Sequence, residues 1–323
     1  MARQAQLSAL ETEGLKADLL QLRNEIKGVS SSSLADGVGT PAGTPSQGDA
    51  ASAYREKIDT LSSEVRDDNP YSRLMALKSM GIVKNYEDIR LKSVIVVGVG
   101  GIGSVAAEML TRCGIGKLLL WDYDTVEIAN MNRLFFRPEQ AGMSKTDAAA
   151  QTLKQINPDV EVRTICERMT LEQLETETRR ADVVVDCTDN FEVRYAINSA
   201  CVKTGTPLVS GAAVQLEGQL MVIDPRQSDK PCYRCLYDNA GETELNCATT
   251  GIAAPVVGAI GTLQALETLK LIIGLGETLA GYLLTFDAKY MDWRKLKLPK
   301  NPECGTCGAR TDHGPEDQRG SLT

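Results

Sequence analysis

The 323-residue sequence predicts an α/β protein with a Rossmann-like, doubly wound and mostly parallel sheet, an antiparallel extension and a structural zinc site. Three observations predict this fold class. Short apolar strands alternate with helices from residue 93 onward, a glycine-rich turn joins the first strand to the first helix, and two Cys-x-x-Cys pairs stand far apart in the last third of the chain.

The ends of the chain differ in composition from its centre. Residues 1–28 place leucines at roughly helical spacing among charges, which predicts an amphipathic helix, either a short coiled coil or a solvated helix that docks nowhere. Residues 29–53 are rich in Ser, Gly, Ala, Pro and Thr and predict a flexible linker. We therefore expect one globular domain over residues 54–308 and a disordered tail over residues 309–323.

Alternating strands and helices follow one another through the centre of the chain. The strands are predicted over 94–98, 117–121, 160–165, 183–187 and 207–210, and the helices over 104–113, 145–156 and 191–204. After Gly211, residues 214–216 and 219–223 alternate around Glu217-Gly218 and predict an antiparallel hairpin. Strands over 282–286 and 293–298 close the predicted domain.

Composition excludes several classes of function. The net charge of −8 and the absence of a basic run argue against nucleic-acid binding. Residues 1–10 hold no apolar signal segment, and the apolar stretch 251–276 is interrupted by polar residues, so it predicts a buried helix and no membrane contact. A cytoplasmic location follows by default. The single histidine, His313, lies in the polar tail, which excludes a histidine base in the core.

The glycine turn reads Gly98-Val99-Gly100-Gly101-Ile102-Gly103. Gly100, Gly101 and Gly103 let the backbone approach a phosphate, and the start of the following helix favours negative charge. Asp122 ends the next strand, where a carboxylate accepts hydrogen bonds from ribose hydroxyls. Alone, this pair would suggest NAD.

Cations after the second strand favour a triphosphate instead. Asn130 and Arg133 follow Asp122, and Lys145 opens a helix soon after. Arg and Lys neutralise the charge that shifts as pyrophosphate leaves, whereas dinucleotide dehydrogenases have no need of them. The alternative is that Arg133 and Lys145 are ordinary surface charges.

A polar pair follows the strand predicted over 183–187. Asp189 and Asn190 stand at the carboxyl end of that strand, where ligands of such sheets bind. A carboxylate there is well placed to hold Mg²⁺ against the phosphates. The alternative is that Asp189 caps the helix that begins at Phe191.

Nine cysteines in such a chain should be reduced thiols, metal ligands or nucleophiles. The two Cys-x-x-Cys pairs predict a tetrahedral structural zinc site that ties the C-terminal segment to the domain, with a redox role as the rival interpretation. Its ligands are Cys232, Cys235, Cys304 and Cys307.

The other cysteines divide by context. Cys113, Cys187 and Cys201 fall in apolar patterns and are predicted in the core, while the position of Cys166 is uninformative. Cys247 lies in a polar stretch just before the long apolar helix that we expect from about Ile252, and a thiol near a helix N-terminus is a plausible nucleophile. Without a histidine base it would need an activated substrate such as an acyl-adenylate. The alternative is an inert loop cysteine.

Together these motifs resemble the ubiquitin-activating-type adenylyltransferases, the HesA/MoeB/ThiF family, over about residues 66–308. The earlier stretches look most like the branch that activates the ubiquitin-fold modifier, and the later ones more like MoeB and ThiF. The earlier stretches are 69–78, 107–117 and 129–136, and the later ones 186–191, 210–213, 231–237 and 254–258. The resemblance implies that residues 54–308 form an adenylation domain with zinc knuckles.

The resemblance also implies roles for residues at the predicted nucleotide site. Gly101 and its neighbours would cradle the phosphates of ATP and Asp122 would hold the ribose. Asn130, Arg133 and Lys145 would stabilise the transition state at the α-phosphate.

Three further roles rest on the same resemblance. Asp189 would organise Mg²⁺. Arg73 matches an arginine that family dimers supply to the partner subunit's ATP, which implies a homodimer. Cys247 aligns with the thioester-forming cysteine of the eukaryotic enzymes.

These roles imply an ATP-dependent enzyme that activates the C-terminal glycine of a small ubiquitin-like protein, first of all the ubiquitin-fold modifier, by adenylation and then a thioester on Cys247. A conjugating enzyme would act downstream. The first alternative is a sulfur-carrier adenylyltransferase that stops at the acyl-adenylate and is followed by a sulfur donor. An NAD-dependent oxidoreductase and a catalytically inactive scaffold are the others.

Overall fold

The computed structural model describes most of the predicted globular domain. The described residues are 57–58, 60–133, 135–238 and 251–308. The predicted N-terminal helix, linker and C-terminal tail, and Cys247 with them, lie outside the described residues.

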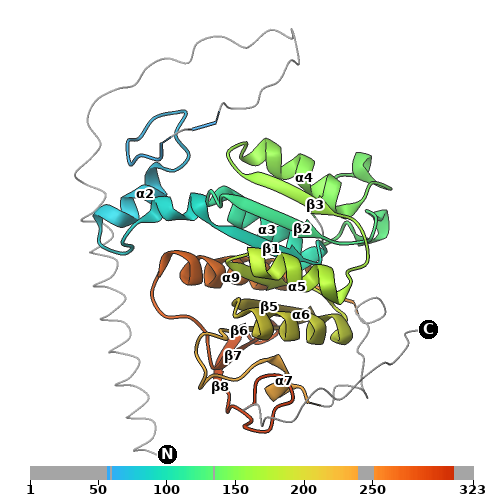
Figure 1. Ribbon diagram of the computed structural model, residues 1–323. Coiled ribbons are helices and arrows are strands. Elements are labelled where there is room, and N and C mark those ends of the chain that lie inside the picture. Colours follow the sequence, from blue (N-terminus) through green and yellow to red (C-terminus); the bar gives the residue numbers. More distant parts are fainter. Residues whose placement is uncertain (1–56, 59, 134, 239–250, 309–323) are drawn as a thin grey trace, which may run out of the picture. The chain divides into compact units, whose positions relative to one another are not determined.

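The described strands form one eight-stranded sheet with the order β3-β2-β1-β4-β5-β6-β7-β8 (Figure 1). The first five strands along the chain are parallel, and the last three add an antiparallel extension beyond β5. This confirms the predicted fold class. The strands are β1 (Ser93–Val97), β2 (Lys117–Trp121), β3 (Glu161–Ile165), β4 (Val183–Asp186), β5 (Leu208–Val214), β6 (Glu217–Ile223), β7 (Tyr282–Asp287) and β8 (Asp292–Lys297).

Helices connect the strands, and three of the described α-helices were not predicted. The α-helices are α2 (Ser72–Ser79), α3 (Gly101–Arg112), α4 (Lys145–Ile156), α5 (Leu171–Arg180), α6 (Phe191–Thr204), α7 (Tyr233–Leu236) and α9 (Ala254–Ile273), and short 3-10 helices span Tyr86–Leu91, Ile128–Asn130 and Pro138–Gln140. The sequence patterns missed α2, α5 and the single-turn α7. In α5 the apolar signal is weak, because Leu174 is buried while Leu171 is exposed.

Both faces of the parallel sheet are covered. Val94 and Val96 of β1 pack in a core with α3, α4 and α9, whereas Ile95 and Val97 pack on the opposite side with α5 and α6. Successive residues of a strand point to opposite faces, so a continuous apolar run is what a strand buried on both sides requires. Within the sheet order, β1 and β4 are neighbours whose helical connections lead in opposite directions. Ligands of such folds bind at the carboxyl ends of the strands at this switch point.

The hairpin after Gly211 differs from its prediction. Strand β5 continues to Val214, and the turn lies at Gln215 and Leu216 instead of Glu217-Gly218. Gln215 adopts a positive φ of 53°. Gly218 is needed for packing, since a Cβ at this position would lie 2.6 Å from Ile260 Cδ1 of α9. A glycine required by close packing was therefore mistaken for a turn glycine.

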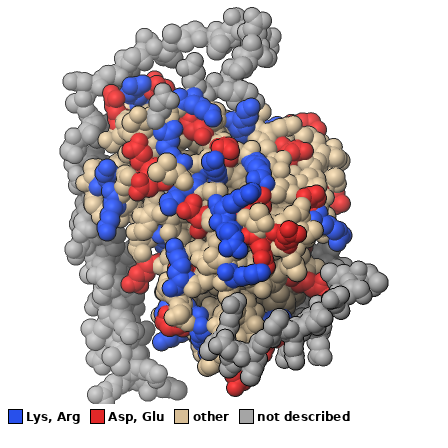
Figure 2. Space-filling view, viewed as in Figure 1, with Lys and Arg blue, Asp and Glu red and all other residues tan. Residues whose placement is uncertain are grey.

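Helix α9 is long and apolar enough to cross a membrane by length and composition alone, yet 56% of its most apolar window is buried in the protein. Its polar residues have partners inside: Gln264 donates to the backbone oxygens of Asp186 and Val209, and Glu267 accepts from the backbone N–H of Leu279. The helix thus packs as a core element, as predicted. On the face shown in Figure 2, side chains of both charge signs are interleaved.

Candidate functional site

The glycine turn brings β1, α3 and the end of β4 into close contact. Gly98 has a φ of +83°, and a Cβ at this residue would lie 2.9 Å from the backbone oxygen of Cys187. A Cβ at Gly103 would lie 1.8 Å from the backbone oxygen of Gly98. Glycine is therefore the only residue that lets the turn close against β4 at these two positions.

Helix α3 starts at this turn without a side-chain cap. Its N-cap is Gly100, where a Cβ would meet no atom within 4 Å. The first backbone N–H groups of a helix have no partner within the helix, and its dipole favours an anion at this end. The start of α3 can therefore bind a phosphate.

Asp122 fixes the turn to the end of β2. Its carboxylate accepts hydrogen bonds from the backbone N–H of Val99 at 2.7 Å and of Asp124 at 2.8 Å. Burial raises the pKa of Asp122, although the charge of Lys145 and these two N–H groups act in the other direction. Each carboxylate oxygen has a further lone pair, so Asp122 can still accept hydrogen bonds from ribose hydroxyls.

The loop after β2 folds back and returns Lys145 to Asp122. Thr125 and Ser144 form an antiparallel bridge, and the backbone N–H of Lys145 donates to the oxygen of Asp124. The Lys145 ammonium then donates to the Asp124 carboxylate at 2.7 Å, and its side chain is only 12% exposed. Lys145 is thus held at the site by an acidic neighbour and is no ordinary surface charge.

Arg133 lies on the other side of the glycine turn. A Cβ at Gly101 would lie 3.0 Å from the backbone oxygen of Arg133 and 2.7 Å from a methyl group of Val257. The Arg133 guanidinium donates to Asn130 Oδ1 at 2.6 Å, and Asn130 in turn donates to Glu127 at 2.7 Å. The structure therefore brings both predicted cations, Asn130, Asp122 and the glycine turn to one place.

A further cation, Arg168, which the sequence analysis did not single out, follows β3. The Arg168 guanidinium stands 4.7 Å from the ring centroid of Tyr123, the residue after Asp122. Both side chains are exposed. A polar stretch after β3 gave no periodic signal, but the carboxyl end of each parallel strand is where such residues meet.

Asp189 and Asn190 follow β4 and are both exposed. Asn190 Oδ1 accepts a hydrogen bond from the backbone N–H of Val193 and caps α6, so this oxygen already has a structural partner. The alternative interpretation, in which Asp189 caps this helix, is therefore wrong, because Asn190 is the cap. Asp189 makes no hydrogen bond or ion pair with the described residues, and its carboxylate is available at the carboxyl end of β4.

A buried polar network lies below this loop, and the sequence did not reveal it. Arg194 of α6 donates to Ser210 Oγ at 3.3 Å, to the backbone oxygen of Gly211 at 3.0 Å and to that of Thr188. Asp186 lies 3.7 Å from Arg194 and accepts from Ser210 at 2.8 Å. Burial, the largest single effect, lowers the pKa of Arg194, and the charge of Asp186 is the strongest of several interactions that together raise this pKa above its usual value.

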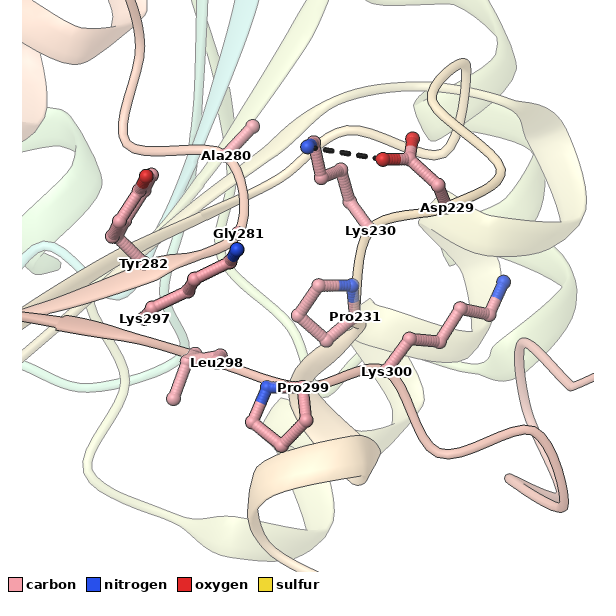
Figure 3. Close-up of a pocket in the computed structure, with 10 residues that line it drawn as sticks. All are labelled: Asp229, Lys230, Pro231, Ala280, Gly281, Tyr282, Lys297, Leu298, Pro299 and Lys300. Carbon is pink, nitrogen blue, oxygen red and sulfur yellow. Dashed lines mark ion pairs between the residues drawn. The ribbon is translucent and has the colours of Figure 1, made fainter.

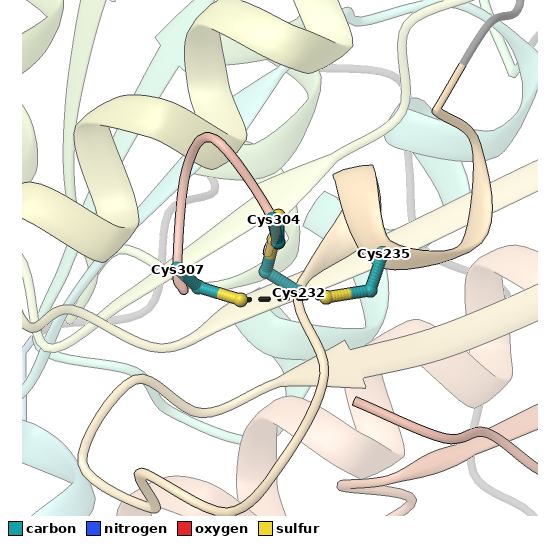
Figure 4. A group of neighbouring side chains, drawn as sticks. All are labelled: Cys232, Cys235, Cys304 and Cys307. Carbon is teal, nitrogen blue, oxygen red and sulfur yellow. Dashed lines mark hydrogen bonds between the residues drawn. The ribbon is translucent and has the colours of Figure 1, made fainter. Parts of the chain in front are cut away.

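The four predicted zinc ligands form one cluster (Figure 4). The sulfurs of Cys232 and Cys304 are 3.7 Å apart, those of Cys235 and Cys307 are 3.4 Å apart, and all four lie within 4.8 Å of one another. A tetrahedral ion with zinc–sulfur distances of about 2.3 Å places its sulfurs about 3.8 Å apart. The arrangement therefore suits zinc, and it leaves no open coordination position for catalysis.

The four thiols differ in their surroundings: burial raises the pKa of Cys232 and of Cys307, whereas the pKa of Cys304 is lowered. Although burial opposes it, backbone N–H groups of Cys307 and Thr306 lower the pKa of Cys304 to about 7. Asn198 of α6 is fully buried; its amide donates to Cys232 Sγ at 3.6 Å and accepts from the backbone N–H of Tyr233. A partner of this kind orients a metal ligand from outside the coordination sphere.

The remaining predicted residues lie apart from this geometry. Arg73 is exposed on α2 and makes no hydrogen bond or ion pair with the described residues. Cys201 is buried and Cys113 and Cys187 are partly buried, in line with the predicted core positions, whereas Cys166 is exposed.

Comparisons with known proteins agree with this arrangement. The ThiF family model matches residues 71–306. The chain is 47% identical over 275 residues to ubiquitin-like modifier-activating enzyme 5 of Dictyostelium discoideum, covering 79% of this chain and 71% of the relative. The enzyme of the same name from Arabidopsis thaliana is 44% identical over 275 residues, which cover 77% of this chain and 63% of that relative. The chain thus spans about two thirds of the length of these relatives.

Solved structures share the fold at lower identity. Escherichia coli MccB is similar with a TM-score of 0.66 and 22% identity, covering 79% of this chain and 77% of MccB. A structure of MccB with ATP gives a TM-score of 0.64 and 23% identity, with 74% of each chain covered.

Zinc should be stoichiometric and structural. We expect one zinc per chain by metal analysis, and we expect Cys304→Ser to lose the metal and to lower the melting temperature more than it changes ATP affinity, because the cluster pins the C-terminal segment. Cys166→Ser, an exposed cysteine outside the cluster, is the control. Metal-free wild-type protein that melts at the same temperature would contradict the assignment.

The buried pair of Asp186 and Arg194 should matter for stability. Arg194→Met leaves the Asp186 carboxylate buried without its cation, which should lower the free energy of unfolding by about 3 kcal/mol or more. Arg163→Met, which removes an exposed partner of Glu177, should change it by less than about 1 kcal/mol. Urea denaturation measures both, and equal midpoints for the two variants would refute the proposed importance of the network.

Proposed function

This chain belongs to the ThiF family, and from that premise we propose that it is an ATP-dependent enzyme that adenylates the C-terminal glycine of a small ubiquitin-like protein. The observation that carries the proposal is the meeting of the glycine turn, Asp122, Arg133 and Lys145 at the carboxyl ends of the parallel strands. Identities of 42–47% to ubiquitin-like modifier-activating enzymes support the substrate class. The ubiquitin-fold modifier is the first candidate.

The first step needs positioning and charge neutralisation. An oxygen of the modifier's terminal carboxylate attacks the α-phosphorus of ATP, the bond to the bridging oxygen breaks, and its electron pair leaves with pyrophosphate. The start of α3 binds phosphate oxygens, and Asp122 accepts hydrogen bonds from the ribose. Arg133 and Lys145 neutralise the charge that moves to the leaving group.

The partners of the two cations indicate how they are kept ready. Lys145 exchanges the Asp124 carboxylate for a phosphate oxygen, while Asn130 holds the guanidinium of Arg133 in place. Donors that are already fixed before the substrate arrives need no reorganisation during the reaction. Glu127 in turn accepts a hydrogen bond from the Asn130 amide and so helps to fix Asn130 beside Arg133.

Asp189 is the residue that we propose to hold Mg²⁺. Its exposed carboxylate follows β4, next to the glycine turn, and an oxygen ligand of this kind suits the ion. When bound, Mg²⁺ would reduce the negative charge of the phosphates.

A second step would use Cys247. Its thiolate attacks the acyl carbon of the adenylate, a thioester forms, and AMP leaves. Cys247 lies outside the described residues, but the chain re-enters them at Gly251, whose oxygen accepts from the backbone N–H of Gln215. If the enzyme stops at the adenylate instead, it belongs functionally with the sulfur-carrier adenylyltransferases.

The setting of the enzyme is part of the proposal. Arg73 lies exposed on α2 and would complete the site of a second subunit in a homodimer. A conjugating enzyme, or a sulfur donor in the alternative, would receive the product. We place the reaction in the cytoplasm, since four metal-binding thiols are favoured in a reducing compartment.

Two variants separate adenylation from thioester formation. In Cys247→Ala, modifier-dependent exchange of pyrophosphate into ATP should persist, and the adduct that dithiothreitol cleaves should disappear, because only the second step needs a thiol. In Arg133→Ala both should fall, the exchange by about a hundredfold, since a transition-state contact of this kind contributes roughly 3 kcal/mol.

The same assay decides between the alternatives. Wild-type protein that exchanges pyrophosphate but never forms the adduct would assign the enzyme to the sulfur-carrier type. Wild-type protein that exchanges no pyrophosphate with any ubiquitin-like or sulfur-carrier protein would refute the proposed function.

Sharing of sites within a dimer can be tested by mixing variants. Arg73→Ala and Lys145→Ala should each be inactive alone. A mixed dimer should regain part of the activity, because one of its two sites then has both an intact Lys145 and the partner's intact arginine. Mixed dimers that form by native mass spectrometry but stay inactive would show that Arg73 does not act across the interface.

A further inference from the structure

A basic pocket lies at the other end of the sheet from the nucleotide site. Strand β7 begins beside the end of β6, and β6 ends beside the start of β5, so this edge corresponds to the amino ends of the parallel strands. The pocket has a volume of about 340 Å³. It is lined by residues 229–231, 280–282 and 297–300 (Figure 3).

The zinc cluster joins the two sides of this pocket. One side ends at Pro231, next to Cys232, and the other ends at Lys300, shortly before Cys304. Lys300 also donates to the backbone oxygen of Ser228 at 2.5 Å, and the backbone N–H of Leu298 donates to Gly281 at 2.9 Å. Hydrogen bonds therefore connect the segment 297–300 to Ser228 and to Gly281, and the four cysteines connect it to the segment that ends at Pro231.

Positive charge is concentrated at this pocket in a chain whose net charge is −8. Lys230, Lys297 and Lys300 are among the lining residues, and Asp229 is the one acidic residue of that lining (Figure 3). Asp229 is 74% exposed, so water screens its ion pair with Lys230. Lys297 is exposed and forms no ion pair with the described residues.

Gly281 gives Lys230 its place. It has a φ of +86°, and a Cβ there would lie 3.1 Å from Cδ of Lys230. The glycine therefore lets the alkyl chain of Lys230 pack against the backbone while the ammonium group stays at the pocket. Pro231, Ala280 and Leu298 supply apolar parts of the lining.

The pocket continues into an open sheet edge. Strand β8 ends at Lys297, and none of the described strands pairs with its outer side. An extended peptide can add to such an edge through backbone hydrogen bonds. Lys295 of β8 lies 4.1 Å from the ring centroid of Tyr282, which brings a further cation to this border.

We propose that this pocket binds carboxylate side chains of an acidic, extended segment of a protein partner, which lies along β8. A volume near the lower end of the usual range of about 300–1,000 Å³ for binding pockets suits one or two side chains at a time. The lysines supply the positive charge, and the apolar lining residues Pro231, Ala280 and Leu298 accept the neighbouring aliphatic side chain. Lysines on an edge strand can also serve only to prevent aggregation, and the test separates the two roles.

The test uses the full-length zinc-bound protein and a fluorescein-labelled decapeptide of alternating Glu and Val. Fluorescence anisotropy should show binding to wild type that weakens by about tenfold or more in Lys230→Glu/Lys297→Glu, and that also weakens as salt is raised. Lys289→Glu changes the other end of the same hairpin and is the matched control, with affinity expected within about twofold of wild type. A peptide of alternating Gln and Val should bind at least about tenfold more weakly.

Several outcomes would overturn the proposal. They are equal binding of the Glu and Gln peptides, an equal loss in Lys289→Glu, and no binding at all by well-folded wild type. Full displacement of the Glu peptide by millimolar inorganic phosphate would assign the pocket to free anions, and tighter binding of a single-stranded oligonucleotide would assign it to nucleic acid. Pyrophosphate exchange is measured on the same preparations. It tests adenylation alone, so a failure of peptide binding can be told apart from a failure of the proposed function.

Discussion

The close approach of two backbone segments at the end of β1 determines where the reactive groups of this protein lie. At Gly98 and Gly103 there is no room for a Cβ, because the oxygens of Cys187 and of Gly98 itself occupy that space. The contact sets the start of α3 against the end of β4. Asp122 then binds the same turn through Val99, and the loop that follows it returns Lys145. A side chain at either glycine would separate the phosphate-binding turn from β4.

Local signals explain what the sequence could predict. The bounds of β2, α4 and α6 were predicted as observed, because apolar patterns are encoded within a few positions of the chain. The four-cysteine cluster was predicted because paired Cys-x-x-Cys spacing has few other uses. The glycine turn and its cations belong to the same category.

Contacts between distant segments explain what could not be predicted. The pair of Asp186 and Arg194 depends on α6 packing against the end of β4 and the middle of β5, which no local pattern specifies. Gly218 resembled a turn residue, but glycine is required there because the side chain of Ile260 in α9, over forty positions away, occupies the space of a Cβ. Asn190 and Asp189 are neighbours with the same kind of side chain, and only the structure shows which of them caps the helix.

Helix α9 connects these parts physically. Near its start, Val257 contacts the position of Gly101 in the phosphate-binding turn, and further along Gln264 donates to the backbone of β4 and β5. Gly251 and Ala253, just before α9, form backbone hydrogen bonds with Gln215 at the β5–β6 turn. The segment that carries Cys247 therefore leads into a helix that touches the proposed nucleotide site at Gly101. Because packed interiors do not deform gradually, a displacement at the start of α9 would be felt at Gly101. The proposed adenylation and the proposed thiol step would then depend on the same rigid element, which is a physical reason to expect both steps in one domain.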